Sequence, residues 1–341
     1  MDKQIVFTQK NTAKLLDVEP QSLGANQVRV KTLFSTISNG TERANLTGDS
    51  VVSIHSNPDD KAVFPRFVGY STSGVVVEKG ADVKTLEVGD RVAMYWTKHR
   101  SYNVVDEKNA VKIESEGVSF EEASIAHIAT FPLAAIRKTK IEIGESLMVM
   151  GLGILGLLAV QLAHAAGAVP VIAVDPVKER REKALKFGAD YALDPFETDF
   201  DQKVKAITNG GVNAAIEVTG QGAGLNETLD CMAKFGRVAL LGCTRNSDFT
   251  IDYYRKVHGP GISLIGAHTA ARPMVESYPG YFTTADDIKV ILRLCAINRI
   301  NIKDMIEETY SPAECTEVYN RLANDKNFPT VVQFDWNRLG E

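Results

Sequence analysis

The feature that most constrains this chain is a glycine-spaced loop near its middle, Gly151-Leu152-Gly153-Ile154-Leu155-Gly156. A short apolar run, Ser146–Met150, precedes the loop, and a helical pattern from about Ile154 to Ala166 follows it. The first glycine of such a loop permits a tight turn. The second lets the backbone approach a pyrophosphate, and the third lets the helix pack close to the strand. Because a helix N-terminus also favours phosphate, the pattern predicts a dinucleotide site of the Rossmann type rather than a glycine turn without a ligand.

A second apolar strand, Val169–Val174, ends in Asp175, about 20 residues after the loop. An acidic side chain at this point accepts hydrogen bonds from the ribose hydroxyls of NAD and repels the 2′-phosphate of NADP. Arg180 and Arg181 follow in a helical segment, 177–187, and either reach a 2′-phosphate or belong to a solvated helix face. The acidic residue favours NAD as the cofactor.

The chain has three regions of different pattern. Residues 1 to about 120 carry short strand-like runs separated by turns, which is typical of a barrel-like β domain. Residues 121–267 alternate apolar strands with amphipathic helices, which predicts a doubly wound parallel sheet. After residue 268 the pattern predicts helices around 285–296 and 312–323 and a last strand at 330–334. The predicted fold class is therefore α/β.

Composition excludes several classes of protein. The 341 residues carry a formal net charge of −5 with dispersed lysines and arginines, so we expect no nucleic-acid partner. The most apolar window, 147–169, is broken by glycines and polar residues, so we expect no membrane span, and the N-terminus lacks a signal-peptide pattern. The four cysteines show no paired spacing and are expected to be buried thiols in the cytoplasm.

The order of these parts resembles the medium-chain dehydrogenase/reductase superfamily over nearly the whole chain. Four stretches carry the resemblance besides the glycine loop: Gly69-Tyr70-Ser71-Thr72-Ser73-Gly74, Val88-Gly89-Asp90-Arg91-Val92, Lys186-Phe187-Gly188-Ala189-Asp190 and Glu217-Val218-Thr219-Gly220. The resemblance implies a GroES-like catalytic domain, 1–128 plus 268–341, into which a Rossmann domain, 129–267, is inserted. It also implies hydride transfer between the domains and a homodimer or homotetramer.

The resemblance carries cofactor roles over to individual residues. It implies that Asp175 binds the ribose and that Arg180 flanks the adenosine. The positions that line the nicotinamide side are Val218, Thr219, Leu241, Gly242, Ala267 and His268.

The zinc-containing members resemble one another in three catalytic ligands, which this chain largely lacks. The stretch that holds their cysteine reads Ile37-Ser38-Asn39-Gly40-Thr41-Glu42 here, so Asn39 stands at the cysteine position. Tyr70 and Ser71 replace their His-Glu pair, and the third ligand position falls near His127. Because catalytic zinc needs about three protein ligands, we expect no metal. An atypical zinc site built from His127, Glu42 or His99 is the alternative.

Hydride transfer without zinc still needs a group that exchanges a proton with the substrate oxygen. Tyr70 and His127 stand at two former ligand positions, so one of them is the predicted general acid or base. Thr41 and Glu42 are the predicted relay or substrate contacts. The alternative for His127 is a buried structural histidine at the domain junction.

Two further groups remain open as site residues. Tyr95, Trp96, Lys98 and His99 fall on the segment that lines the substrate cleft in the resembled family, and otherwise form an exposed strand end. Arg272 either meets a substrate anion or pairs with Glu276.

The predicted function is an NAD(H)-dependent, zinc-independent oxidoreductase that interconverts a secondary alcohol (a polyol, sugar or hydroxy acid) and its carbonyl. The first alternative is a zinc-free quinone or enoyl reductase, which generally uses NADPH. A zinc-dependent alcohol dehydrogenase with atypical ligands and a nucleotide-binding protein without turnover are the others.

Overall fold

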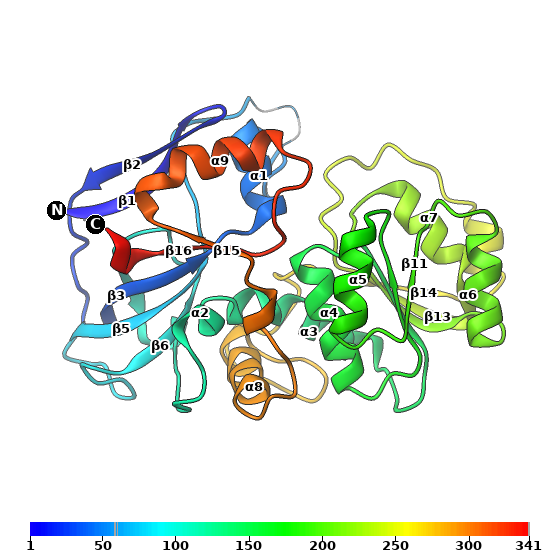
Figure 1. Ribbon diagram of the computed structural model, residues 1–341. Helices are drawn as coiled ribbons and strands as arrows, with labels where there is room; N and C mark the ends of the chain where they lie inside the picture. The colour runs from blue at the N-terminus through cyan, green and yellow to red at the C-terminus, as the bar shows by residue number, and fades with distance from the viewer. Residues whose placement is uncertain (58, 60, 340–341) are drawn as a thin grey trace. The chain divides into compact units, whose positions relative to one another are not determined.

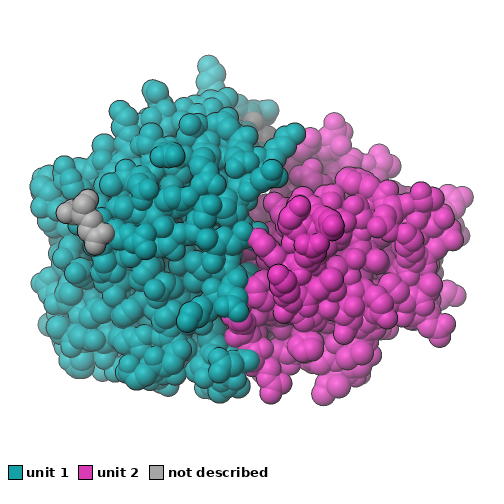
Figure 2. Space-filling model, in the orientation of Figure 1, with its two compact units in different colours: residues 1–128, 288–298, 302–341 teal, residues 129–287, 299–301 magenta. Residues whose placement is uncertain are grey.

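A computed structural model describes residues 1–57, 59 and 61–339 (Figure 1). The chain divides into two compact units, and each is built from separate stretches of sequence (Figure 2). Unit 1 comprises residues 1–128, 288–298 and 302–341, and unit 2 comprises 129–287 and 299–301. The segment 268–287, which the sequence analysis assigned to the β domain, lies in unit 2.

Unit 2 is built on a parallel sheet of six strands. Its strands are β9 (Leu147–Met150), β10 (Val171–Val174), β11 (Tyr191–Leu193), β12 (Val212–Glu217), β13 (Met232–Leu240) and β14 (Ser263–Gly266). They lie in the order β11-β10-β9-β12-β13-β14. This is the doubly wound order in which the chain reverses direction across the sheet beside β9, and ligands bind at the carboxyl ends of the strands there.

The helices of unit 2 connect these strands. They are α4 (Ile154–Ala165), α5 (Lys178–Lys186), α6 (Phe200–Thr208) and α7 (Gly222–Asp230). Helix α4 packs on β9 and β10, and α7 packs on β12 and β13. The strands β9 and β10 are buried along their whole length, as the unbroken apolar runs require in a parallel sheet covered on both faces.

Unit 1 is a β structure with two sheets. Strands β1 (Asp2–Gln9), β2 (Thr12–Val18) and β4 (Arg66–Phe67) form one sheet. The larger sheet has the order β15-β16-β3-β5-β6-β8, and β7 pairs with β3. Its strands are β3 (Gln27–Thr36), β5 (Ser71–Lys79), β6 (Arg91–Tyr95), β7 (Tyr102–Asp106), β8 (Ala110–Lys112), β15 (Glu308–Tyr310) and β16 (Val332–Asp335).

The C-terminal part of the chain completes unit 1. Strand β16 pairs with β3, and α9 (Cys315–Asn324) packs on β2 and on α1 (Asn39–Thr47) (Figure 1).

The remaining helices of the two units are α2 (Phe120–Ala123), α3 (Ala126–Thr139) and α8 (Thr284–Ala296). Short helical turns lie at Glu107–Asn109, Tyr254–His258, Lys303–Met305, Pro312–Glu314 and Trp336–Arg338. The α/β class, with a β unit built from both ends of the chain and a Rossmann sheet between them, is confirmed.

Candidate active site

The glycine loop of unit 2 connects the end of β9 to the start of α4. Gly151 has a φ of +98°, which a residue with a side chain rarely adopts. A Cβ atom on Gly156 would lie 1.9 Å from the carbonyl oxygen of Gly151, whereas a Cβ on Gly153 would meet nothing within 4 Å. The third glycine is therefore required by packing. The second leaves an open approach to the backbone at the helix N-terminus, which suits a phosphate.

Asp175 lies directly after β10, beside this loop, and its side chain is almost fully buried. Its carboxylate accepts hydrogen bonds from the backbone N–H of Leu152 at 2.8 Å and of Val177 at 2.8 Å. The guanidinium of Arg180, on α5, is 3.6 Å from the same carboxylate. The acidic group is thus fixed at the carboxyl end of β10 with a cation beside it.

The other predicted cofactor residues follow the neighbouring strands at the same edge of the sheet. Val218 and Thr219 follow β12, Leu241 and Gly242 follow β13, and Ala267 and His268 follow β14.

Glu217, the last residue of β12, holds the β12 loop in place. Its carboxylate accepts hydrogen bonds from the N–H groups of Thr219 and Gly220, at 2.8 and 3.2 Å, and from the Thr219 hydroxyl. Burial raises the pKa of the Glu217 carboxyl. Its backbone oxygen accepts from the N–H groups that begin the β13 loop. Glu217 was not predicted as a site residue, although an acidic residue at the end of an apolar strand is a signal that the sequence contains.

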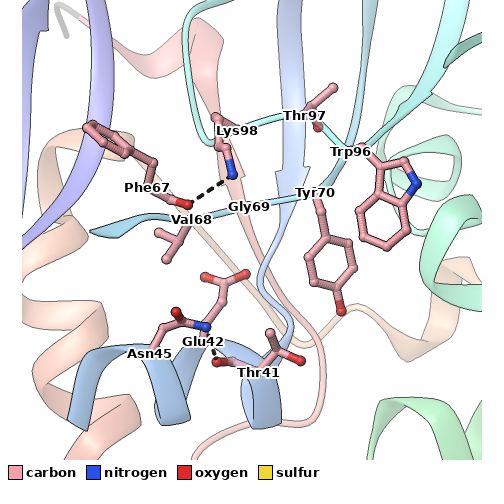
Figure 3. A pocket seen from close by; sticks show the side chains of 10 residues that line it. All are labelled: Thr41, Glu42, Asn45, Phe67, Val68, Gly69, Tyr70, Trp96, Thr97 and Lys98. Atoms are coloured by element: carbon pink, nitrogen blue, oxygen red, sulfur yellow. Dashed lines mark hydrogen bonds between the residues drawn. The ribbon is translucent and has the colours of Figure 1, made fainter. Parts of the chain in front are cut away.

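Unit 1 contains a pocket of about 230 Å³ (Figure 3). It is lined by Thr41, Glu42, Asn45, Phe67, Val68, Gly69, Tyr70, Trp96, Thr97 and Lys98. Three of the four predicted catalytic residues, Thr41, Glu42 and Tyr70, therefore meet in one pocket. Of the segment left open in the sequence analysis, Trp96 and Lys98 line the pocket, whereas Tyr95 and His99 are buried.

Two chain segments cross to form one wall of the pocket. The N–H of Trp96 donates to the carbonyl oxygen of Tyr70, and the N–H of His99 donates to that of Val68, both at 2.9 Å. A Cβ on Gly69 would lie 2.5 Å from the His99 nitrogen, so only glycine permits this approach. The ammonium of Lys98 donates to the Phe67 carbonyl oxygen at 3.0 Å.

Glu42, at the base of the pocket, is held by buried partners. Its carboxylate contacts Nε2 of His99 at 3.1 Å and accepts a hydrogen bond from the Tyr319 hydroxyl, on α9. All three side chains have at most 1% of their residue surface exposed. Burial and the neighbouring carboxylate raise the pKa of Tyr319 well above its ordinary range. The carboxylate is therefore fixed in position, because moving it would leave buried polar groups unpaired.

Tyr70 and His127 occupy different places around the pocket. The Tyr70 hydroxyl donates a hydrogen bond to Ser38, at the start of α1, and its ring lines the pocket. His127 is 1% exposed and does not line the pocket; its Nδ1 donates to the backbone oxygen of Tyr70 at 2.8 Å. The imidazole packs edge-on against Trp96, with ring centroids 4.8 Å apart. His127 therefore contacts two residues of the pocket wall, Tyr70 and Trp96, without lining the pocket itself.

The residues at the positions that hold zinc ligands in the resembled family make hydrogen bonds within this protein. The Asn39 side-chain amide donates to the backbone oxygens of Pro329 and Thr330, at 2.8 and 3.2 Å. Within the described residues, no cluster of three or more His, Cys, Asp or Glu side chains is arranged to hold a metal ion. His99 and Glu42 are adjacent, but no third side chain of these types in the described part of the chain completes a set with them. The residues present do not fit a catalytic zinc.

Arg272 lies in unit 2, where its guanidinium is buried beside Asp287 at 3.5 Å and donates to the backbone oxygen of Thr130. The guanidinium is 3% exposed and its printed ion pair is with Asp287, which does not favour contact with a substrate anion, while the pairing with Glu276 stays a prediction. No helix in the described part of the chain is long and apolar enough to cross a membrane.

Comparison with known proteins places both units in one family. The family model of the alcohol dehydrogenase GroES-like domain matches residues 24–139, and that of the zinc-binding dehydrogenases matches residues 155–283. An L-threonine 3-dehydrogenase of Pyrococcus horikoshii is 30% identical over 74% of this chain and 79% of its own length. The chain belongs to the medium-chain dehydrogenase/reductase superfamily. It is accordingly an oxidoreductase of the alcohol and polyol dehydrogenase type.

Other members of the superfamily match almost the full length. A D-guloside 3-dehydrogenase of Escherichia coli is 25% identical, with 93% of this chain and 95% of the relative covered. The crystal structure of 2R,3R-butanediol dehydrogenase from Bacillus subtilis superposes with a TM-score of 0.81 at 20% identity and covers 98% of this chain and 99% of that one. The superfamily and the enzyme class predicted from the sequence are confirmed.

Proposed function

We propose that this protein is an NAD(H)-dependent, zinc-independent oxidoreductase that interconverts a secondary alcohol and its carbonyl. The observation that carries the proposal is the pocket of unit 1, in which a tyrosine hydroxyl, a threonine and a fixed carboxylate converge and which Tyr70 enters from one of the positions matched to the zinc ligands of the resembled family. The named relatives include dehydrogenases of a sugar glycoside and of an amino acid with a secondary alcohol, which supports the same type of reaction.

The glycine loop of unit 2 fits a dinucleotide. The open face over Gly153 would admit a pyrophosphate at the N-terminus of α4, and Asp175 would accept hydrogen bonds from the adenosine ribose. A bound nicotinamide would take up the hydride in alcohol oxidation and supply it in carbonyl reduction. Because Asp175 would repel a 2′-phosphate and Arg180 already lies against it, the site favours NAD over NADP.

Tyr70 is the residue that we assign to proton exchange with the substrate. Its hydroxyl lies at the pocket and donates to Ser38, and a phenol oxygen is also able to accept a hydrogen bond from an alcohol. In the reverse direction the same hydroxyl would donate to the carbonyl oxygen, as general acid catalysis requires. His127 acts as a positioning residue, because its ring packs behind Tyr70 and Trp96 and bonds to the Tyr70 backbone.

Zinc independence rests on the chemistry of the donor set. Asn39 is committed to two backbone oxygens, and a neutral tyrosine hydroxyl is a poor zinc ligand. The hydroxyl of Tyr70 and the fixed charge of Glu42 would instead provide the polar environment for the substrate oxygen.

Titration of the protein with NADH and NADPH, with Asp175→Asn as the variant, tests the cofactor assignment. We expect NADH to bind at least tenfold more tightly than NADPH and the variant to lose this preference. Tighter binding of NADPH by the unmodified protein would contradict the assignment and favour the quinone or enoyl reductase. Hydride exchange between NADH and a panel of carbonyl compounds separates an enzyme from a nucleotide-binding protein without turnover.

A further inference from the structure

We propose that the pocket of unit 1 binds an uncharged sugar ring, with Trp96 as its stacking surface and Lys98, Thr41 and Asn45 as the residues that bind its hydroxyls. This inference rests on the proposed function and narrows the substrate from secondary alcohols in general to cyclic sugars.

Trp96 is held in an unusual way for a large aromatic residue. Its φ is +57°, a region that bulky residues adopt only where the surrounding structure imposes it. Its backbone N–H is bound to Tyr70, and its ring packs on His127, yet 49% of the residue remains exposed at the pocket. A strained backbone that presents an aromatic ring to solvent points to a ligand-binding role. The electron-rich face of an indole attracts the weakly positive C–H bonds on one face of a sugar ring.

Polar side chains line the same pocket as this aromatic ring. The Lys98 ammonium has three N–H groups, of which one is used by the Phe67 carbonyl oxygen. The backbone of Lys98 is fixed because the side chain of Asn103 bonds to both its N–H and its carbonyl oxygen. On the opposite side, the Thr41 hydroxyl and the Asn45 side-chain oxygen make no hydrogen bond within the described residues.

The polar side chains of the pocket suit a ligand with two neighbouring hydroxyls better than a ligand with one polar group. Lys98 and Glu42 both line the pocket, but their charged atoms are not within 4.0 Å of each other. A vicinal pair of hydroxyls can accept from the Lys98 ammonium and donate to the Asn45 side-chain oxygen, because each hydroxyl is both donor and acceptor.

The charges of the pocket favour a neutral ligand. Glu42 and Lys98 are its only charged lining residues among those described, so their formal charges cancel. A carboxylate or phosphate that reached Lys98 would also face the fixed, buried charge of Glu42. The volume of about 230 Å³ lies below the roughly 300–1,000 Å³ typical of sites for drug-sized ligands, which limits the occupant to about one ring. A ring also loses less conformational freedom on binding than an open-chain polyol.

Calorimetric titration with a panel of methyl hexopyranosides, the matching open-chain alditols and the matching sugar phosphates tests the proposal. We expect at least one glycoside to bind at least tenfold more tightly than its alditol and its phosphate. Trp96→Leu should lose at least tenfold in affinity for that glycoside and Trp96→Phe should lose less, while Lys98→Met should lose at least fivefold. Because the other tryptophan, Trp336, is buried, quenching of the protein fluorescence by the glycoside gives a second readout at Trp96.

Lys108→Met is the matched control, since the Lys108 side chain is 77% exposed and lies outside the pocket. Thermal unfolding and NADH affinity should be unchanged in the folded variants. The proposal is overturned if Trp96→Leu binds the glycoside as the unmodified protein does, or if an alditol or a sugar phosphate binds more tightly. Glycoside binding without hydride exchange would instead refute the proposed function. Turnover of simple alcohols without sugar binding would refute only this inference.

Discussion

Two alanine substitutions in the glycine loop should separate folding from cofactor binding. A methyl group at position 156 would lie 1.9 Å from the carbonyl oxygen of Gly151, and separations under 3.0 Å are essentially never seen for real Cβ atoms. Gly156→Ala must therefore move α4 away from β9. Gly153→Ala adds the same methyl group where nothing lies within 4 Å, at a φ of −70° and a ψ of −169° that any residue adopts.

The expected magnitudes differ accordingly. Overpacking of this kind costs about 1–3 kcal/mol. For a domain of this size each kcal/mol lowers the melting temperature by roughly 2–4 °C. Gly153→Ala should change stability by less than about 0.5 kcal/mol, because the lower entropy of the unfolded chain offsets the poorer N-cap. Its methyl group would nevertheless stand between the helix N-terminus and the pyrophosphate, so NADH affinity should fall by about tenfold or more, or about 1.4 kcal/mol.

Thermal unfolding without cofactor and fluorescence titration with NADH measure the two effects. Gly153→Ala should unfold at the temperature of the unmodified protein and bind NADH weakly, whereas Gly156→Ala should unfold at a lower temperature. Normal NADH binding by Gly153→Ala would refute the position that we assign to the dinucleotide. An unchanged melting temperature of Gly156→Ala would refute the packing argument.

Three further predictions concern the polar groups around the two sites. Tyr319→Phe removes one hydrogen bond to the buried Glu42 carboxylate and should lower the free energy of unfolding by about 1.5–3 kcal/mol in urea; an unchanged unfolding midpoint would contradict the network. Burial raises the pKa of Glu217, so the folded protein holds that proton more tightly than the unfolded chain, and this contribution to stability is lost as pH rises through the folded pKa. Glu217→Gln should therefore gain stability relative to the unmodified protein as pH rises above the usual carboxyl range, and a pH-independent difference in melting temperature would argue against it. Asn39→Ala should cost about 1–3 kcal/mol in unfolding experiments, since two backbone oxygens lose their donor, and should leave the metal content of the purified protein unchanged; a loss of bound metal would identify Asn39 as a ligand.

Much of unit 2 could be predicted from the sequence because its signals are local. The predicted helix from Ile154 to about residue 166 corresponds to α4, and the predicted segment 177–187 corresponds to α5. Strand β10 ends one residue before Asp175, as the apolar run indicated. Periodicity, glycine spacing and the position of one acid after a strand are sufficient for this half of the chain.

The pocket of unit 1 was only partly predictable, because distant segments build it. The sequence singled out Thr41, Glu42 and Tyr70, but it gave no indication that Tyr319 bonds to Glu42 from the other end of the chain. Likewise, nothing local to Asn39 shows that its amide is used by backbone oxygens of residues 329 and 330. Such pairings depend on tertiary packing, and their partners carry no common spacing or motif.

The rate of hydride transfer from a secondary alcohol, followed by the appearance of NADH in a single turnover, tests the central claim most directly. The comparison is between the unmodified protein, the same protein after treatment with a strong chelator, and Tyr70→Phe. Metal content is measured on each sample. We expect the chelated protein to react at the original rate and Tyr70→Phe to react at least about tenfold more slowly with unchanged NAD affinity. A stoichiometric metal whose removal abolishes the reaction, together with an unimpaired Tyr70→Phe, would contradict the account.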